Sequence, residues 1–378
     1  MSVSIHAIAT AVPEEVYEQS FIRDLMKAQP QFDRRAQRLV SSIYNASGID
    51  RRYSVVADMH AQPGDPPSPF FNPDTRELLT PSTGTRNDLY ARAARDLFTV
   101  AAQRVLDACP EFTPAEVTHV ITVSCTGFFA PGPDYYVVRD LQLSPSVQRY
   151  HLGFMGCYAA FPALRAAKAF CEADPSAVVL VICAELCSLH VQLDTDPDTL
   201  IANSVFADGA AAALVSARTP PPGSPALRMD SFDTTLTPTG EADMAWTVGD
   251  QGFKMVLSTY VPDIIEEHIH GALAPLWGSE AALADRLHRD VQHWAVHPGG
   301  RSILDKVQGA LSLSDRQLVP SREVLREYGN MSSATVLFVL QRIAKQPPEA
   351  EGERVCALAF GPGLTVDMGL FTKLPPLA

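Results

Sequence analysis

Residues 151–184 read HLGFMGCYAAFPALRAAKAFCEADPSAVVLVICA. The part from Ala159 to Ala173 is rich in alanine, which has the highest intrinsic helix propensity, and it predicts a helix. Asp174 and Pro175 end that helix, and the β-branched run AVVLVICA at 177–184 predicts a buried strand. A helix followed at once by a buried strand is typical of α/β layers.

The alternation of helices and strands continues on both sides of this stretch. A loop rich in proline, glycine, serine and threonine is expected at 61–87. The predicted strands are THVITVS at 118–124, ADGAAAALVS at 207–216 and VQHWAV at 291–296, and the predicted helices are 20–50, 88–108, 255–275 and 332–345.

The chain is predicted to fold as two halves. The segment TPPPGSPA at 219–226 is the strongest internal boundary, because three prolines in succession cannot continue a helix or a central strand. The halves end alike: FADG at 206–209 leads into one apolar strand, and FGPG at 360–363 leads into another. We therefore expect two halves, 1–226 and 227–378, in an α/β sandwich.

Composition excludes several classes of protein. The 378 residues are 46% hydrophobic, which is enough for a large buried core, and the formal net charge is -13. A nucleic-acid-binding protein usually carries a basic face, and no long lysine or arginine run occurs. No apolar run approaches the roughly 18 residues that suggest a membrane span. Seven scattered cysteines and the lack of a recognisable targeting segment favour reduced thiols in a cytoplasmic protein.

Cys157 is the first candidate for chemistry. It follows a glycine and precedes the alanine-rich helix, so it should lie near the positive end of a helix dipole, which favours a thiolate. A thiolate can take an acyl group from a thioester. The alternative is a buried structural cysteine, and this segment alone does not decide between them.

Two further candidates lie in the C-terminal half. His297 follows a predicted strand in HWAVHPGG, and Asn330 precedes a predicted helix in EYGNMSSATV. Taken singly, a loop histidine and a helix-capping asparagine are the commoner explanations. His293 and His297 have no obvious carboxylate beside them in sequence, so a zinc site is not expected.

Together these sites resemble the type III polyketide synthases, the chalcone and stilbene synthase family, and the chain is similar to bacterial members. The resemblance extends over nearly the whole chain. The matching stretches are VSCTGFFAPGPDY at 123–135, the Cys157 segment, AELCSL at 184–189, VFADGAAAALV at 205–215, HPGG at 297–300, YGNMSSATV at 328–336 and AFGPGLTVDMGL at 359–370.

The resemblance implies a thiolase-like fold, a five-layered αβαβα sandwich of two pseudo-repeated halves, in a homodimer. It implies that Cys157 is the nucleophile and that His297 and Asn330 act in decarboxylation and oxyanion stabilisation. It also assigns an aromatic gate to Phe206 and an active-site scaffold to Gly361, Pro362 and Gly363.

The chain departs from the plant enzymes of this family at several positions. Met255 stands in place of a second gating aromatic residue and Cys125 in place of a threonine, and Cys187 is expected to add apolar wall. The plant enzymes' basic residues for coenzyme A are not matched at Leu39, Ser42 and Ala46. Arg34, Arg35 or Arg38 are possible substitutes.

The expected reaction is decarboxylative condensation of malonyl-CoA onto an acyl starter held by Cys157. Metal, nicotinamide and flavin are not expected, since coenzyme A thioesters are the substrates and no nucleotide-binding glycine motif occurs. The adaptable Met255 favours a medium- or long-chain fatty acyl starter and a pyrone or resorcinol product. Trp246, near a glycine of the plant enzymes, favours instead a small starter or malonyl-CoA alone, as in naphthalene-forming relatives.

Three other functions remain open at this point. A single-round ketoacyl synthase shares the Cys-His-Asn set, and a Cys-His-Asn hydrolase would release free acid from the same residues. A non-catalytic protein of the same fold is the third, and the retention of all three residues argues against it.

Overall fold

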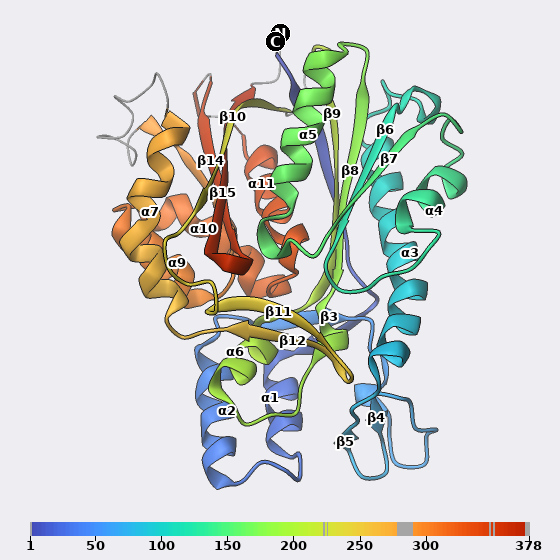
Figure 1. The fold of residues 1–378 in the computed structure, drawn as a ribbon, viewed down its shortest axis with the longest axis vertical. Helices are drawn as coiled ribbons and strands as arrows, with labels where there is room; N and C mark the ends of the chain where they lie inside the picture. Colours follow the sequence, from blue (N-terminus) through green and yellow to red (C-terminus); the bar gives the residue numbers. More distant parts are fainter. Residues whose placement is uncertain are drawn as a thin grey trace.

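The computed structural model describes residues 2–374 apart from 222, 223, 225, 278–289, 348 and 351. Nine strands of the described chain hydrogen-bond into one sheet (Figure 1). In spatial order they are β13 (His293–Val296), β14 (Arg354–Gly361), β15 (Thr365–Leu374), β10 (Ala226–Leu236), β1 (Ser4–Ala11), β9 (Asp208–Ser216), β8 (Val178–Leu186), β6 (His119–Ser124) and β7 (Gln148–Gly153).

Helices cover both sides of this sheet, and three small two-stranded sheets lie outside it. The helices are α1 (Gln19–Lys27), α2 (Arg34–Ala46), α3 (Thr83–Asp107), α4 (Pro133–Asp140), α5 (Ala160–Ala173), α6 (Pro197–Val205), α7 (Val261–Trp277), α9 (Arg301–Ala310), α10 (Asp315–Tyr328) and α11 (Thr335–Lys345). The small sheets pair β2 (Glu15–Glu18) with β3 (Arg51–Ser54), β4 (Phe71–Asn72) with β5 (Glu77–Leu78), and β11 (Met244–Gly249) with β12 (Gly252–Leu257).

The sheet consists of two halves that meet at a narrow seam. β1 pairs with β10 only through Ser4 opposite Arg228 and Ile5 opposite Leu227. Close to the seam, β1 also shifts its register against β9, and β10 shifts its register against β15. Such irregularities bend strands, so the two halves can fold toward each other.

Alternate residues of each strand enter different cores, as the two-residue period of a strand requires. In β8, Val179 and Val181 face the central core, which α5 and α11 fill, whereas Leu180 and Ile182 face α3. In β14, Ala357 faces the same central core, and its neighbours face the core beneath α7, α9 and α10.

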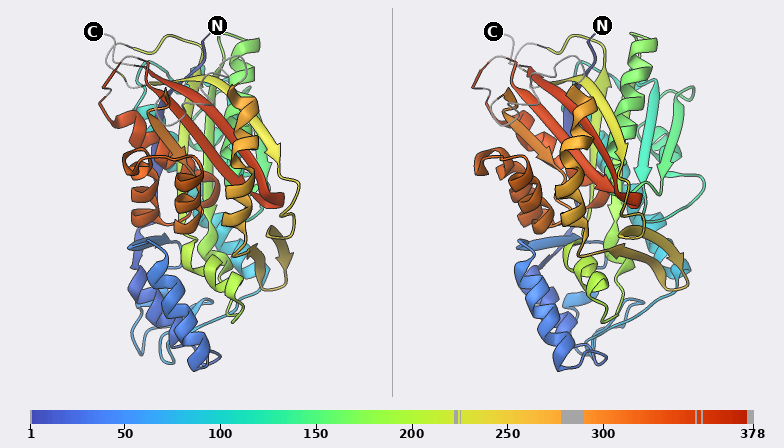
Figure 2. Two further views of the ribbon diagram at one scale, coloured as in Figure 1. Left: turned by 90° about the vertical axis from the view of Figure 1, so that its left-hand side faces the viewer. Right: turned by 60° about the vertical axis from the view of Figure 1, so that its left-hand side comes forward.

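The result is five layers. α3 and α4 cover one half of the sheet, α7, α9 and α10 cover the other, and α5 and α11 lie between the halves (Figure 1). This confirms the thiolase-like αβαβα sandwich. α1 and α2 project at the end where the β11–β12 hairpin lies, away from the two chain termini (Figure 2).

The stretch that decided the fold forms α5 and β8 as predicted. Two other expectations need correction. Residues 20–50 form two helices, α1 and α2, instead of one. The helix predicted over 255–275 begins only at Val261, and Met255 lies in β12. The hairpin turns at Gly249–Gly252, and a short apolar run such as the one after it does not distinguish a strand from a helix.

Pro222, Gly223 and Pro225 of the predicted boundary segment lie outside the described residues. The division into 1–226 and 227–378 stays a prediction. Within the part of the chain that the structure describes, no helix has both the length and the apolarity to cross a membrane.

Candidate active site

Cys157 lies in a single helical turn, Gly156–Tyr158, directly before α5. The turn depends on Gly156, whose φ is +75° and whose position leaves no room for a side chain, because a Cβ there would lie 2.3 Å from Cδ of Pro362. The Gly156 N–H donates to the sulfur of Cys125 at 3.0 Å. Contacts on two sides therefore fix the backbone that presents the Cys157 thiol.

Asn330 is held by both ends of its amide. Its Oδ1 accepts the N–H of Ser332 at 2.9 Å, and its Nδ2 donates to the carbonyl of Gly299 at 3.3 Å. In this orientation Nδ2 lies 4.0 Å from Sγ of Cys157. The two halves of the molecule thus bring their candidate residues together.

The backbone of Asn330 pairs with that of Phe206 in an isolated parallel bridge. The Asn330 N–H donates to Val205 at 2.8 Å, and its carbonyl accepts from Ala207 at 2.8 Å. Phe206, which follows α6, is therefore fixed in register with Asn330.

His297 lies at the end of β13, where its N–H donates to the carbonyl of Leu358 at 2.8 Å. Its side chain is only 1% exposed, and neither ring nitrogen has a hydrogen-bond partner among the described residues. A buried polar group without a partner is costly, and such groups in native proteins call for an explanation. The imidazole is free to bond an incoming molecule.

Burial keeps Cys157 and His297 neutral when each is considered separately. It raises the pKa of the Cys157 thiol to about 12, against the opposing effect of hydrogen bonds from Ser332 and Asn330, and the carboxylate of Glu185 adds to the rise. Burial also lowers the pKa of His297 to about 3. Desolvation thus opposes the thiolate that the helix end is expected to favour. A neutral imidazole can, however, accept the thiol proton.

The three residues line one cavity of about 30 Å³, called here the chamber. Phe206, Met255 and Pro362 also line it, as the resemblance implied. The β11–β12 hairpin forms one wall, with Trp246 directly opposite Met255 across the two strands. The ring centroids of Trp246 and Phe206 lie 6.4 Å apart in an edge-to-face arrangement. Trp246 thus reduces the free space beside Cys157.

The other predicted substrate-binding residues lie outside the chamber. Cys125 is buried beneath Gly156. Cys187 lines a neighbouring cavity of about 20 Å³, which shares Phe206 and Met255 with the chamber. In the scaffold loop only Pro362 reaches the chamber: Gly361 is pressed against Tyr158, and Gly363 supplies a φ of +71°.

A groove of about 540 Å³ shares Leu257, Gly299 and Ile303 with the chamber. Its cations are Arg301 and Lys306 of α9. Ala46, in the last turn of α2, also lines the groove, but Arg34, Arg35 and Arg38 do not. Those three arginines lie two to three turns away along α2.

Sequence reasoning missed Glu185, which is fully buried at the end of β8. Its carboxylate accepts the Cys125 N–H at 2.9 Å and the hydroxyls of Thr126 at 2.9 Å and Ser333 at 2.5 Å, and burial raises its pKa. An acidic residue inside an otherwise apolar strand was the signal. Arg301 was missed too, because nothing in the sequence places it at a groove.

Comparison with known proteins identifies the family of the chain. Family models for the N-terminal and C-terminal domains of chalcone and stilbene synthases match residues 2–219 and 228–375. The alpha-pyrone synthesis polyketide synthase-like Pks18 of Mycobacterium tuberculosis (strain ATCC 25618 / H37Rv) is 32% identical over 377 residues, covering 97% of this chain and 90% of that protein.

Two solved structures share the fold along nearly their entire length. PKS-I from the brown alga Ectocarpus siliculosus has a TM-score of 0.86 at 29% identity, covering 99% of this chain and 98% of that one. 1,3,6,8-Tetrahydroxynaphthalene synthase from Streptomyces coelicolor A3(2) has a TM-score of 0.82 at 28% identity, covering 98% and 99%. The chain belongs to the chalcone and stilbene synthase family, as a type III polyketide synthase and a decarboxylating acyltransferase.

Proposed function

We propose that this enzyme extends an acyl starter, bound as a thioester to Cys157, with units from malonyl-CoA decarboxylated beside His297 and Asn330. One observation carries the proposal. The Cys157 sulfur lies 4.0 Å from the Asn330 amide nitrogen, and a histidine with an unpartnered ring lines the same cavity.

In the loading step His297 takes the proton of Cys157. The sulfur attacks the carbonyl of the starter thioester, and coenzyme A leaves with that proton as a free thiol. Transfer of the proton between two neighbouring groups creates a thiolate and an imidazolium together. The two opposite charges then stabilise each other, whereas a single buried charge would have no such partner.

In the extension step malonyl-CoA loses carbon dioxide, and negative charge develops on its thioester oxygen. Neutral His297 retains one N–H, and Nδ2 of Asn330 carries another. Each donor aimed at a developing oxyanion contributes about 3 kcal/mol. The carbanion attacks the acyl thioester on Cys157, and the Cys157 thiolate leaves. The lengthened chain is then a coenzyme A thioester, and its transfer back to Cys157 releases coenzyme A before the next round.

Coenzyme A would enter through the groove that adjoins the chamber. We assign its phosphates to Arg301 and Lys306. Arg301 is half-exposed with Asp305 3.7 Å away, and Lys306 is held by Glu266 at 2.6 Å and by Asp263 at 3.0 Å. All of these are surface ion pairs, which solvent weakens. The scheme requires no metal, nicotinamide or flavin.

The starter we propose is a medium-chain fatty acyl group, with an alkyl pyrone as product. The cavity behind Phe206 and Met255 reaches Cys187 and is lined by apolar residues together with polar ones such as Gln192 and Asn203. Its apolar residues would support the first carbons of an alkyl chain that leads away from Cys157. The Mycobacterium relative named for alpha-pyrone synthesis supports the product class.

Condensation of malonyl-CoA alone is the second candidate. Trp246 favours it, because the indole leaves a chamber of only about 30 Å³. The Streptomyces tetrahydroxynaphthalene synthase, a structural neighbour, has a name that fits a compact aromatic product.

We also propose a homodimer. β7 forms one edge of the sheet, and its strand residues from Gln148 to His151 are exposed, including Tyr150 at 40%. An uncovered edge strand is a ready surface for pairing with a second copy. Light scattering during size-exclusion chromatography distinguishes a dimer of about twice the 41.0 kDa chain mass from a monomer.

Mass spectrometry of products tests the function directly. The purified enzyme is given malonyl-CoA alone or with acetyl-, hexanoyl-, octanoyl- or palmitoyl-CoA. We expect pyrones that carry the intact alkyl starter. Free acid as the only product would identify a hydrolase. A product extended by a single unit would identify a ketoacyl synthase. A main product formed from malonyl-CoA alone would show that the second candidate function is correct.

A further inference from the structure

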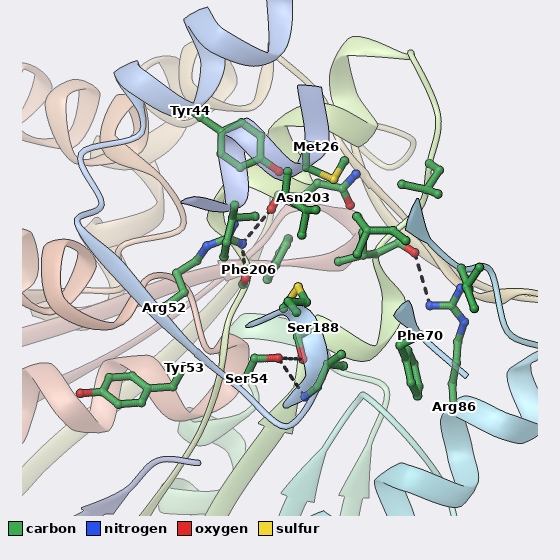
Figure 3. A pocket seen from close by; sticks show the side chains of 18 residues that line it. Met26, Tyr44, Arg52, Tyr53, Ser54, Phe70, Arg86, Ser188, Asn203 and Phe206 are labelled. Atoms are coloured by element: carbon green, nitrogen blue, oxygen red, sulfur yellow. Dashed lines mark hydrogen bonds between the residues drawn. The ribbon is translucent and has the colours of Figure 1, made fainter. Parts of the chain in front are cut away.

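A second cavity shares Phe206 with the chamber, and ten of its lining residues are labelled in Figure 3. This N-terminal cavity of about 60 Å³ is bounded by α1, β3, the segment before α3 and the end of α6. Most of its wall is apolar, and the main contributors are Ile22, Leu25, Met26, Val56, Met59 and Phe70.

Two buried guanidinium groups face this apolar space from different walls (Figure 3). Arg52 is 5% exposed, and its Nη1 donates to the carbonyls of Asn203 and Phe206 at 2.7 Å each. Its Nε donates to Gln19 at 2.9 Å, but its Nη2 has no hydrogen-bond partner among the described residues.

Arg86, in the first turn of α3, is 2% exposed and follows the same pattern. Its Nε donates to the carbonyl of Pro81 at 2.9 Å, and its Nη1 donates to the carbonyls of Leu189 and Val191. Its Nη2 is left without a partner in the described part of the chain. Each arginine therefore makes three hydrogen bonds, of which two in Arg52 and all three in Arg86 go to backbone carbonyls, and each keeps Nη2 unused.

The charges of these arginines are not neutralised. No carboxylate of residues within the described ranges lies within 4.0 Å of either guanidinium. Arg52 has partial compensation, because its guanidinium lies over the Tyr44 ring, 5.8 Å from the centroid, and Asp208 attracts it at longer range. Arg86 has neither, and burial alone lowers its pKa to about 10. An unpaired buried cation is unfavourable, and an anion is the natural partner.

We infer that the N-terminal cavity binds a monocarboxylate with a short alkyl tail, its carboxylate on Nη2 of Arg86 and its tail among Leu25 and Met59. The polar and apolar parts of the cavity match the two parts of such a ligand. Space for roughly four to six water-sized groups suits a tail of about four to six carbons. The ligand would contact Phe206, which also lines the chamber.

Calorimetric titration with hexanoate and with 1-hexanol tests the inference, since the two probes differ mainly in charge. Hexanoate should bind the wild type more tightly than hexanol. Arg86→Gln should weaken hexanoate roughly ten- to hundredfold, the range for a hydrogen bond to a charged group, and leave hexanol nearly unchanged. Equal affinities of the two probes for the wild type would overturn the inference.

Two cavity-filling variants locate the ligand. Leu25→Trp fills the N-terminal cavity and should abolish hexanoate binding, whereas Met244→Trp fills the chamber and should not. The reverse result would place the ligand at Cys157 and refute the site. Tyr44→Phe should leave the hexanoate affinity unchanged. A large loss of affinity in this variant would indicate that the carboxylate binds Arg52 instead of Arg86. Because Leu25→Trp retains both arginines, it decides the question even if Arg86→Gln fails to fold.

Discussion

The chamber and the N-terminal cavity share the ring of Phe206 but differ in the charge of their polar groups. The chamber contains a thiol, an imidazole and an amide, of which burial keeps the first two neutral. The N-terminal cavity contains two guanidinium groups. A neutral set suits a reaction in which charge appears only transiently, because the donors meet the charge when it forms. Permanent buried charge suits a ligand that arrives already ionised.

The largest effect should come from Cys157→Ala. If the chamber works through one nucleophile, starter-dependent extension should fall at least about a thousandfold, since no other group can hold the acyl chain. Intact-protein mass spectrometry after incubation with octanoyl-CoA should show an adduct on the wild type only. Cys171→Ala, a buried change within α5, is the control and should keep the adduct. An adduct that is still formed by Cys157→Ala would show that the acyl chain is held outside the chamber.

Replacement of the Asn330 amide should have the next largest effect. Asn330→Ala should slow malonyl-CoA decarboxylation about 10²- to 10³-fold, the usual cost of one oxyanion donor, while acylation of Cys157 stays much faster. Asn330→Asp keeps the oxygen that accepts the Ser332 N–H but has no N–H to donate. It should therefore be as slow as Asn330→Ala, with a melting temperature closer to that of the wild type. Decarboxylation at the wild-type rate in either variant would show that the amide only positions the loop.

His297→Gln should change how Cys157 reacts with pH. Without the imidazole nothing accepts the thiol proton, and the burial that raises the pKa of Cys157 is not offset by proton transfer to His297. The thiolate fraction, and with it the rate of alkylation by iodoacetamide, should then rise about tenfold per pH unit from pH 7 to 10. At pH 7 the variant should react at least about tenfold more slowly than the wild type. Identical pH profiles would mean that His297 does not share the thiol's proton.

The smallest effect concerns the size of the chamber. Trp246→Gly removes the indole beside Phe206 and should raise catalytic efficiency with longer starters by about fourfold for each methylene newly accommodated. Val248→Gly is the matched control, because Val248 lies on the same hairpin but is 55% exposed. A starter preference that does not change in Trp246→Gly would show that the hairpin does not limit chain length.

The sequence predicted the parts of this molecule that depend on local pattern or on ordered motifs. The α5–β8 unit followed from alanine content and β-branching, and the meeting of Cys157, His297 and Asn330 followed from the family resemblance. What it could not predict depended on packing between distant segments. Burial raises the pKa of Cys157, and a local pattern at a helix end carries no information on burial. Arg301 and Arg86 lie beside segments that are far from them in the sequence.

The same limit applies to the substrate-binding residues. Cys125 stands in place of a threonine of the plant enzymes, but its position beneath Gly156 depends on how Pro362 of the other half packs against Gly156. Met255 lines the chamber, but it lies in a strand where the sequence predicted a helix.

The backbone bridge between Phe206 and Asn330 joins the residue proposed to admit the starter to the residue proposed to polarise malonyl-CoA. If both proposals hold, displacing the backbone of either residue displaces the other, and selectivity and rate depend on each other. Exchange of side chains on this bridge can broaden the range of starters while the bridge stays in place. An insertion into the loop that carries either residue, or replacement of that loop, would shift both residues. An enzyme redesigned in that way should accept more starters but turn over more slowly.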